Sequence, residues 1–489
     1  MSSIPTGWAS DRLKDVATIN AVALSTGTDP DYEFDYLEIS NVDYHGIVDR
    51  NAIERLRFED APSRARRRVA AGSTVISSVR PNLQAVAFFP DAPAHLVCST
   101  GFNVVDPQLS RLSPQFAYYH LISENARQYF EAAATGVGYP AIGDKEFNAI
   151  AVLLPPLPEQ QRITAYLDAS CAAIDAAVAA KRRQIETLDS LRKETVTRAI
   201  THGLKPSTRT KPSGEDWLGE IPAHWSAPCL KRLLREPLTY GLNEAAELEE
   251  RDLPRYLRIT DFDDNGNLRE DTFRSLPREI ACEALLEPND VLFARSGATV
   301  GKTFMFRNYE GEACFAGYLI RARTLLWKLD PLFLYLFTKS TAYESWKNLI
   351  FTQATIQNIS AAKYNYLAIP LPPLDEQHAI VAHVEKKIAE FRSLTACIET
   401  QIATLTAYRK SLIHECVTGQ LRISEADVVR SQLSAKTGHL NPEPSENNGQ
   451  LKTNHADDRQ CYADLGKTIK GGGQVDPLLA LKSATQRGN

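Results

Sequence analysis

The chain has 489 residues, of which 43% are hydrophobic and 24% charged, a composition typical of a soluble protein with two to four domains. Its formal net charge of -5 excludes a uniformly basic nucleic-acid-binding protein, so any basic surface must be local. The 8 cysteines form no CxxC pair, and no signal peptide or run of ~18 apolar residues is present. We therefore expect a cytoplasmic protein with reduced thiols and no membrane span.

The chain contains an internal repeat at an offset of 217 residues, from Leu154 to Leu371. The stretch Leu-Pro-Pro-Leu-Pro-Glu-Gln at 154–160 recurs as Leu-Pro-Pro-Leu-Asp-Glu-Gln at 371–377. Far upstream, the same offset relates Trp8 to Trp225. Because chance does not keep one offset across such distant segments, we expect two copies of one structural unit. The regions between the matching segments have diverged, which favours a role for them in selectivity.

Residues 1–153 and 221–370 form the two predicted domains. In the first, 74–76 and 85–89 are predicted strands joined by a turn at Arg80-Pro81-Asn82, and 116–130 has helical spacing. In the second, 290–294 and 303–306 are predicted strands around a glycine-containing loop, followed by an aromatic-rich helix at 332–349. This order of elements predicts an α+β or α/β fold for each domain.

A proline turn and a long helix follow each domain, at 154–204 and 371–425. Pro158 suits the first turn of a helix, and Glu159 or Glu376 would lie near the positive end of the helix dipole. Heptad spacing then predicts a coiled coil. Its apolar positions are Ile163, Leu167, Cys171, Ile174, Val178, Ile185 and Leu188 in the first copy and Val384, Ile388, Phe391, Ile398, Ile402 and Leu405 in the second.

Each helix of about 40 residues would span roughly 60 Å at ~1.5 Å per residue. Gly203 is the predicted cap after the first helix. Residues 205–220 are predicted to be a linker, and the polar segment 426–489 is predicted to be a disordered tail.

No catalytic motif is evident in the sequence. The segment from Ser296 to Thr303 resembles a phosphate-binding loop, but only three residues separate Gly297 from Gly301, where the motif requires four. It also lies in a predicted hairpin, so a tight turn is the favoured interpretation. The histidines are not clustered at metal-ligand spacing. The sequence therefore favours a binding protein over an enzyme.

Local clusters of basic and amide side chains provide the remaining functional signal. Arginine side chains can bind phosphates and guanine, whereas asparagine and glutamine side chains can form paired hydrogen bonds with adenine. One cluster lies at the predicted turns and another just before each proline turn, at matching places in both copies. For any single residue an ordinary solvated loop is the competing interpretation. The candidate DNA-binding residues are Arg64, Arg66, Arg67, Arg80, Asn82, Gln84, Tyr139, Arg295, Ser296, Thr299, Lys302, Gln353, Thr355, Gln357 and Asn358.

Two variable domains, each followed by Leu-Pro-Pro-Leu-x-Glu-Gln and a long helix, resemble the specificity subunit of type I restriction–modification enzymes. The Ile-Pro-x-x-Trp openings at Ile4 and Ile221 fit this resemblance, as does the Arg-Ser-Gly-Ala-Thr-Val-Gly-Lys hairpin at 295–302. The resemblance covers about 1–425. The first copy lacks the glycine hairpin and has Ser77 to Gln84 in its place.

The resemblance implies two target recognition domains in tandem, with the long helices packed as an antiparallel coiled coil of pseudo-twofold symmetry. Each domain would recognise half of a bipartite, asymmetric DNA site. The chain would do no chemistry and would hold no cofactor. Two methyltransferase subunits would carry S-adenosylmethionine, and two motor-nuclease subunits would use ATP and Mg²⁺. Two alternatives remain open: a coiled-coil scaffold without DNA recognition, and a degenerate restriction–methylation enzyme.

Overall fold

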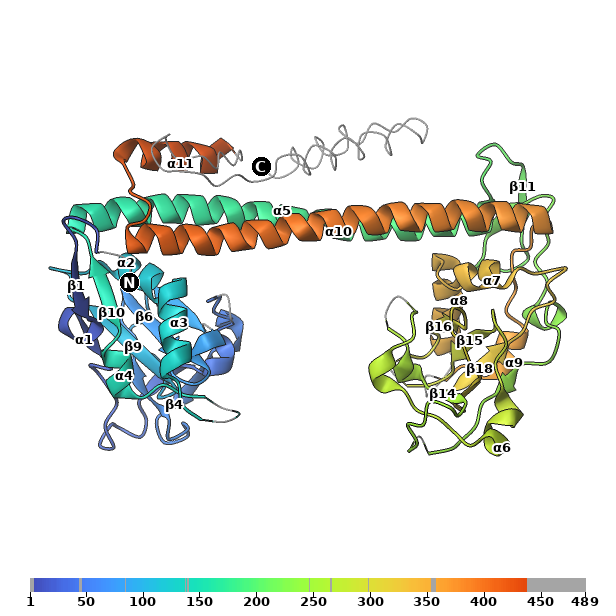
Figure 1. The fold of residues 1–489 in the computed structure, drawn as a ribbon, viewed down its shortest axis with the longest axis horizontal. Coiled ribbons are helices and arrows are strands. Elements are labelled where there is room, and N and C mark those ends of the chain that lie inside the picture. The colour runs from blue at the N-terminus through green and yellow to red at the C-terminus, as the bar shows by residue number, and fades with distance from the viewer. Residues whose placement is uncertain are drawn as a thin grey trace. The chain divides into compact units, whose positions relative to one another are not determined.

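The computed structural model describes residues 4–43, 46–83, 85–136, 138, 140–245, 247–263, 266–297, 299–352 and 358–437 (Figure 1). The chain divides into two compact units. Unit 1 contains the chain up to 182 together with the segment from 398 onward, and unit 2 contains 183–397. Both boundaries between the units fall inside a long helix, so each unit contains the beginning of one long helix and the end of the other.

Unit 1 contains two 4-stranded sheets. One antiparallel sheet has the order β2 (Ala17–Ile19), β9 (Phe102–Pro107), β6 (Ser73–Ser77), β7 (Val86–Phe89). A second has the order β4 (Glu54–Arg57), β3 (Glu33–Leu37), β8 (Leu96–Ser99), β5 (Ala65–Arg68), in which β3 and β8 are parallel. β1 (Ala9–Arg12) pairs with β10 (Ala151–Leu154). The short helices are α1 (Leu13–Val16), α2 (Pro114–Leu121), α3 (Glu124–Ala133) and α4 (Asp144–Asn148).

Unit 2 repeats this topology. Its main antiparallel sheet has the order β13 (Thr239–Tyr240), β18 (Leu319–Ala322), β15 (Val291–Ala294), β16 (Thr303–Met305). β14 (Arg255–Leu257) and β17 (Ala313–Phe315) form the parallel pair. The register repeats as well, since Thr74 lies opposite Val105 and Val291 lies opposite Ala322. The remaining elements are α6 (Arg278–Ala281), α7 (Pro331–Phe337), α8 (Thr341–Thr352), α9 (Ala361–Asn365), β11 (Thr210–Pro212) and β12 (Glu220–Pro222).

The predicted strands around the two turns are confirmed, but each predicted short helix is in fact two. The break falls at Ser123 in unit 1 and at Ser340 in unit 2, which are also 217 residues apart. Each hydroxyl donates to a carbonyl that ends the first helix, at 2.7 and 2.6 Å, and accepts an N–H that begins the second. A serine side chain that competes for backbone bonds favours a helix cap over a helix interior.

The long helices are α5 (Leu157–His202) and α10 (Leu374–Thr418), and both run through both units (Figure 1). In unit 1 the beginning of α5 packs on the end of α10, with Leu167 and Cys416 in one buried cluster. In unit 2 the end of α5 packs on the beginning of α10, with Ile200 and Val384 in another. The pair is therefore antiparallel, as predicted.

The predicted heptad positions range from fully buried to partly exposed. Ile163, Leu167 and Ile174 are almost fully enclosed, whereas Ile185 and Leu188 are partly exposed. One 18-residue window of α5 has a mean hydropathy of 1.3, enough by length and composition alone to cross a membrane. Of this window 28% is buried, and Ile163, Leu167 and Ile174 of α5 belong to the unit 1 core.

Two predictions outside the domains need correction. The predicted linker contains β11, which pairs with β12 in antiparallel register. The predicted disordered tail begins with α11 (Glu425–Thr437), because Ser424 caps it through Asp427 and Val428 packs on the unit 1 core. Residues 438–489 lie outside the described residues. Gly203 follows α5 with a φ of 76°, as its predicted cap position requires.

Candidate DNA interface

In each unit the turn between the two central strands is bonded to the segment that precedes the proline turn. In unit 1, Val79 bridges Ala141, and the Ile142 N–H donates to the Ser78 carbonyl at 2.9 Å. In unit 2, Ser296 bridges Asn358, and the Ile359 N–H donates to the Arg295 carbonyl at 2.9 Å. All these residues correspond at the offset of 217. The two regions that the sequence indicated separately therefore form one surface in each unit.

A third segment joins this surface through the turn between the last two sheet strands. The Ser78 N–H donates to the Gly101 carbonyl at 2.8 Å, and the Arg295 N–H donates to the Tyr318 carbonyl at 2.9 Å. In unit 1 the Thr100 N–H also donates to the Arg64 carbonyl at 2.7 Å. The start of the predicted basic run thus lies at the same end of the sheets as the Arg80 turn.

The basic run of unit 1 is largely engaged within the protein. Arg64 forms an ion pair with Glu38 and donates from Nε to the Tyr36 hydroxyl at 3.3 Å. The Arg66 guanidinium lies 4.6 Å from the centre of the Phe58 ring. Arg67 donates to the Phe102 carbonyl and to Asn103, and burial lowers the pKa of its guanidinium. These contacts fasten β5 to the rest of the unit, a structural role that the run of arginines did not reveal.

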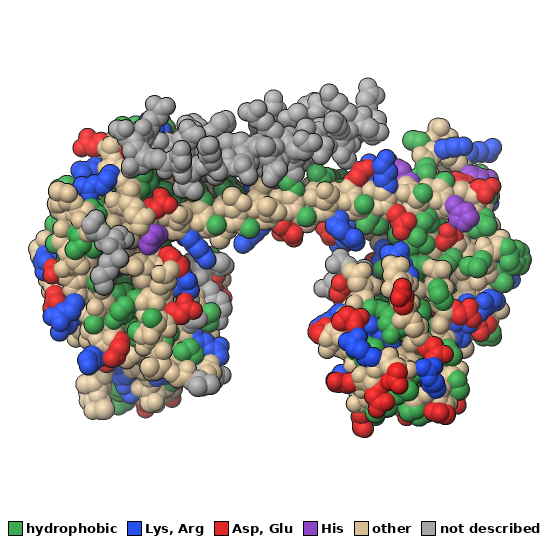
Figure 2. All heavy atoms as spheres, in the orientation of Figure 1, with side chains coloured by type: hydrophobic (Ala, Val, Ile, Leu, Met, Phe, Trp, Pro, Cys, Tyr) green, Lys and Arg blue, Asp and Glu red, His purple; other side chains and the backbone are tan. Residues whose placement is uncertain are grey.

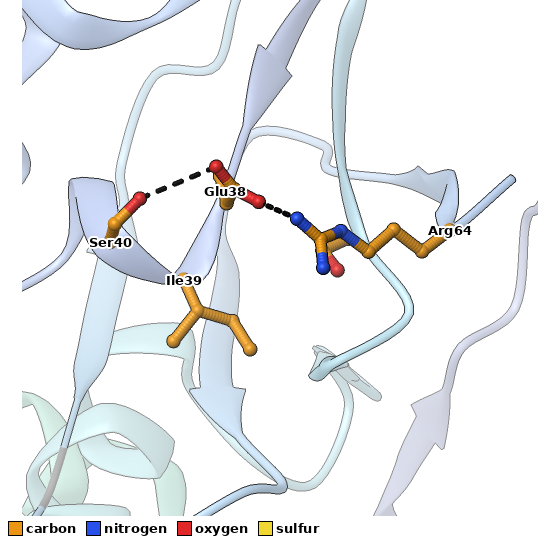
Figure 3. A pocket seen from close by; sticks show the side chains of 5 residues that line it. Glu38, Ile39, Ser40 and Arg64 are labelled. Atoms are coloured by element: carbon orange, nitrogen blue, oxygen red, sulfur yellow. Dashed lines mark hydrogen bonds and ion pairs between the residues drawn. The ribbon is translucent and has the colours of Figure 1, made fainter. Parts of the chain in front are cut away.

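A pocket in unit 1 is lined by Glu38, Ile39, Ser40, Arg64 and Ser99. Figure 3 shows the Arg64 guanidinium and the Glu38 carboxylate pointing toward one another, with the Ser40 hydroxyl 3.5 Å from the same carboxylate. The two charges of this pocket are thus paired with one another. Arg80 is more accessible, since its side chain is exposed and donates to the Gly138 carbonyl at 3.0 Å. Its φ of 49° places it in the left-handed region at the tip of the turn.

In unit 2 the segment that resembles a phosphate-binding loop is a hairpin turn between β15 and β16, as predicted. Gly297 and Gly301 have φ values of 80° and 78°, which suits glycine at both bends. Ser296 and Thr299 are partly exposed, and Lys302 is exposed. The Asn358 side-chain oxygen is enclosed and accepts no hydrogen bond in the described structure.

An aromatic ring lies beside Arg295 in unit 2. Its guanidinium lies 4.7 Å from the centre of the Tyr240 ring, and both Tyr240 and Tyr318 are exposed, at 43% and 63%. Sequence reasoning missed both tyrosines, because they come from separate segments that meet only in the sheet.

Several predicted residues cannot be placed. Those outside the described residues are Gln84, Tyr139, Gln353, Thr355 and Gln357. Asn82 belongs to the 3-10 turn Pro81–Leu83, and its side chain lies outside what the structure describes.

On the face that Figure 2 shows, neither unit presents charges of one sign only. Acidic and basic side chains are interspersed in both units (Figure 2), many of them as ion pairs. Within the described residues, no group of three His, Cys, Asp or Glu side chains is arranged to hold a metal ion. The strand turn of unit 2 is distinguished by the Arg295 guanidinium beside the Tyr240 ring, since arginine donors and aromatic rings are both used in base recognition.

Comparison with known proteins gives one consistent family. The model of the type I restriction modification DNA specificity domain matches residues 5–187 and 279–403, more than half of the chain. The chain is 24% identical over 344 residues to the EcoBI specificity subunit of Escherichia coli, covering 68% of this chain and 71% of that protein. It is 22% identical over 454 residues to the StySPI specificity subunit of Salmonella potsdam, covering 88% and 94%.

A solved structure from a study of the assembly and conformational transition of the type I R-M system has the same fold. Its TM-score is 0.69 at 22% identity, covering 86% of this chain and 100% of that one. The tandem arrangement of two mixed α/β domains with long helices is therefore a fold that this solved structure shares.

Proposed function

Because the chain belongs to the type I restriction–modification DNA specificity family, we propose that each of its two units recognises one half of a bipartite, asymmetric DNA site. One observation carries this proposal: the same three-segment surface is built twice with different side chains. Unit 1 presents Ser78 and Gly101 where unit 2 presents Arg295 and Tyr318. A shared backbone with different donors and rings suits two half-sites of different sequence.

The repeated proline turns support a pair of equivalent partners. Because each unit presents the same turn and the same helix start, two copies of one methyltransferase subunit would find equal docking sites. In this proposal those subunits carry S-adenosylmethionine and methylate adenine at N6, and two motor-nuclease subunits add ATP- and Mg²⁺-dependent translocation and cleavage. The chain itself selects the site in the cytoplasm and performs no chemistry.

DNA binding by the isolated chain should be weak and sensitive to salt, because the formal net charge is -5 and most described arginines are paired. With its methyltransferase partner it should bind one duplex sequence tightly. A gel-shift titration with and without the partner, at low and physiological salt, measures both effects. If a competent partner gives no sequence-selective shift even at low salt, the coiled-coil scaffold becomes the better description.

The degenerate-enzyme alternative needs a separate measurement. We expect no transfer of label when the purified chain is incubated with labelled S-adenosylmethionine and DNA. Adding the methyltransferase subunit should restore transfer to adenine. Transfer of label by the chain alone would overturn its assignment as a non-catalytic subunit.

A further inference from the structure

Almost every described arginine in the domain of unit 2 is paired with an acidic side chain. The pairs are Arg235–Glu287, Arg251–Glu270, Arg255–Glu270, Arg258–Asp261, Arg269–Asp271, Arg274–Glu249, Arg278–Glu312, Arg307–Glu385, Arg321–Glu236 and Arg323–Asp290. Arg295 differs, because no hydrogen bond or ion pair joins its guanidinium to any described residue. Its charge therefore remains available to a ligand.

The Arg295 guanidinium is nevertheless held in place. It lies over the Tyr240 ring at 4.7 Å from the ring centre, and the Tyr240 hydroxyl accepts the Ala361 N–H at 2.9 Å. At the other end, the Arg295 backbone bonds to the Tyr318 carbonyl at 2.9 Å and to the Ile359 N–H at 2.9 Å. Stacking on an aromatic ring fixes the plane of a guanidinium and reduces the entropy lost when it binds.

The position of its donors favours a base edge over a phosphate. Arg295 Nε is enclosed without an acceptor, whereas the two terminal nitrogens are neither enclosed nor bonded. Two parallel N–H groups in a fixed plane match O6 and N7 of guanine in the major groove. A phosphate contact would need only the charge, which a mobile exposed side chain supplies equally well.

We propose that Arg295 is a specificity-determining residue that recognises a guanine in the half-site of unit 2, with Tyr240 as its positioning residue. The proposal rests on the proposed function, since it assigns one base to a half-site that unit 2 recognises. It applies to unit 2 alone, because the equivalent residue in unit 1 is Ser78, which has no guanidinium.

To test this proposal, the complex of the chain and its methyltransferase partner is incubated with random-sequence DNA duplexes. The bound duplexes are sequenced, which gives the base preference at each position of the site. The half-site of unit 2 is the half that changes when the domain at 230–367 is exchanged for that of a relative. Arg295→Ala should lower the preference for guanine at one position of that half-site by about 5- to 150-fold, the range of a bidentate pair. Arg295→Lys, which keeps the charge but not the paired donors, should lose most of the same preference.

Variants of Tyr240 test its positioning role, and a variant of Arg232 serves as the control for Arg295→Ala. Tyr240→Phe keeps the ring and should keep the guanine preference, whereas Tyr240→Ala should weaken it at the same single position. Arg232→Ala removes an exposed arginine that also has no bonded partner in the described structure, and it should leave that position unchanged. Thermal melting of each variant separates a lost base contact from a lost fold.

Three outcomes would overturn the assignment of Arg295. These are no guanine in the half-site of unit 2, an equal loss of affinity at all positions in Arg295→Ala, and a guanine preference retained in Arg295→Lys. Failure of the proposed function gives a different result, because the wild-type complex would then select no bipartite motif at all.

Discussion

The glutamine of each proline turn satisfies three backbone groups and is completely buried. Gln160 accepts the Ser113 N–H at 2.8 Å and donates to the Arg111 and Pro155 carbonyls at 2.8 and 2.9 Å. Gln377 makes the same three bonds in unit 2 with Asp330, Lys328 and Pro372. The glutamine therefore fixes the long helix to the loop before α2 or α7.

Replacing Gln160 should destabilise unit 1 strongly. Gln160→Ala leaves one N–H and two carbonyls without their partner, and an unsatisfied buried group costs ~1–3 kcal/mol. We expect a net loss of about 3 kcal/mol in the free energy of unfolding, measured by urea denaturation, and faster amide exchange at Ser113. Gln161→Ala, at an exposed neighbour, should change stability by less than ~0.5 kcal/mol. Similar exchange at Ser113 in both variants would show that the side-chain bonds are not responsible.

At the level of elements, the β15–β16 hairpin of unit 2 is held from behind by α8. Tyr343 is fully buried and donates from its hydroxyl to the Gly301 carbonyl at 2.9 Å, with the Tyr364 hydroxyl 3.2 Å away. The equivalent residue in unit 1 is Ala126, which cannot make this bond. The hairpin that carries Ser296, Thr299 and Lys302 is thus held by a side-chain hydrogen bond that the equivalent residue of unit 1 cannot make.

Tyr343→Phe should loosen this hairpin while leaving the ring packing intact. The lost hydroxyl leaves the Gly301 carbonyl unpaired, at a cost of ~1–3 kcal/mol. Amide exchange at Gly301 should accelerate, and the complex with the methyltransferase should bind the unit 2 half-site less tightly. Tyr366→Phe, at a residue 64% exposed, is the control and should alter neither quantity. Unchanged exchange at Gly301 in Tyr343→Phe would contradict the proposed support.

The elements that the sequence predicts well are those fixed by local patterns. The proline turns, the strands at 74–76 and 290–294 and the heptads of α5 and α10 depend on neighbouring residues. The basic run was harder to interpret, because the Glu38 that neutralises Arg64 is 26 residues away in the sequence. Tyr240 joins Arg295 only through the pairing of β13 with β18, which no local pattern encodes.

At the level of the whole molecule, the structure gives matched boundaries for exchanging the two domains. In unit 1 the Leu13 N–H donates to the Ile150 carbonyl at 2.9 Å, and in unit 2 the Leu230 N–H donates to the Leu367 carbonyl at 2.8 Å. Immediately outside these bonds, β1 pairs with β10, and Ser226 and Cys229 bridge Leu371 and Ala368 at the same offset. Exchanging residues 13–150 or 230–367 would therefore keep both strands of each of these outer pairings from the original chain.

Each exchange should change one half of the recognised site and leave the other half and the methyltransferase docking intact. The reason is that the two domains have separate buried cores, each with its own turns at the candidate interface. Mapping methylated adenines in cells that carry each chimera, and in cells without the gene, measures both halves at once. An exchange of 1–150 is a useful comparison, because it separates β1 from its native partner β10 and should lower the yield of folded complex. If the 13–150 chimera altered both half-sites, recognition by independent units would be wrong.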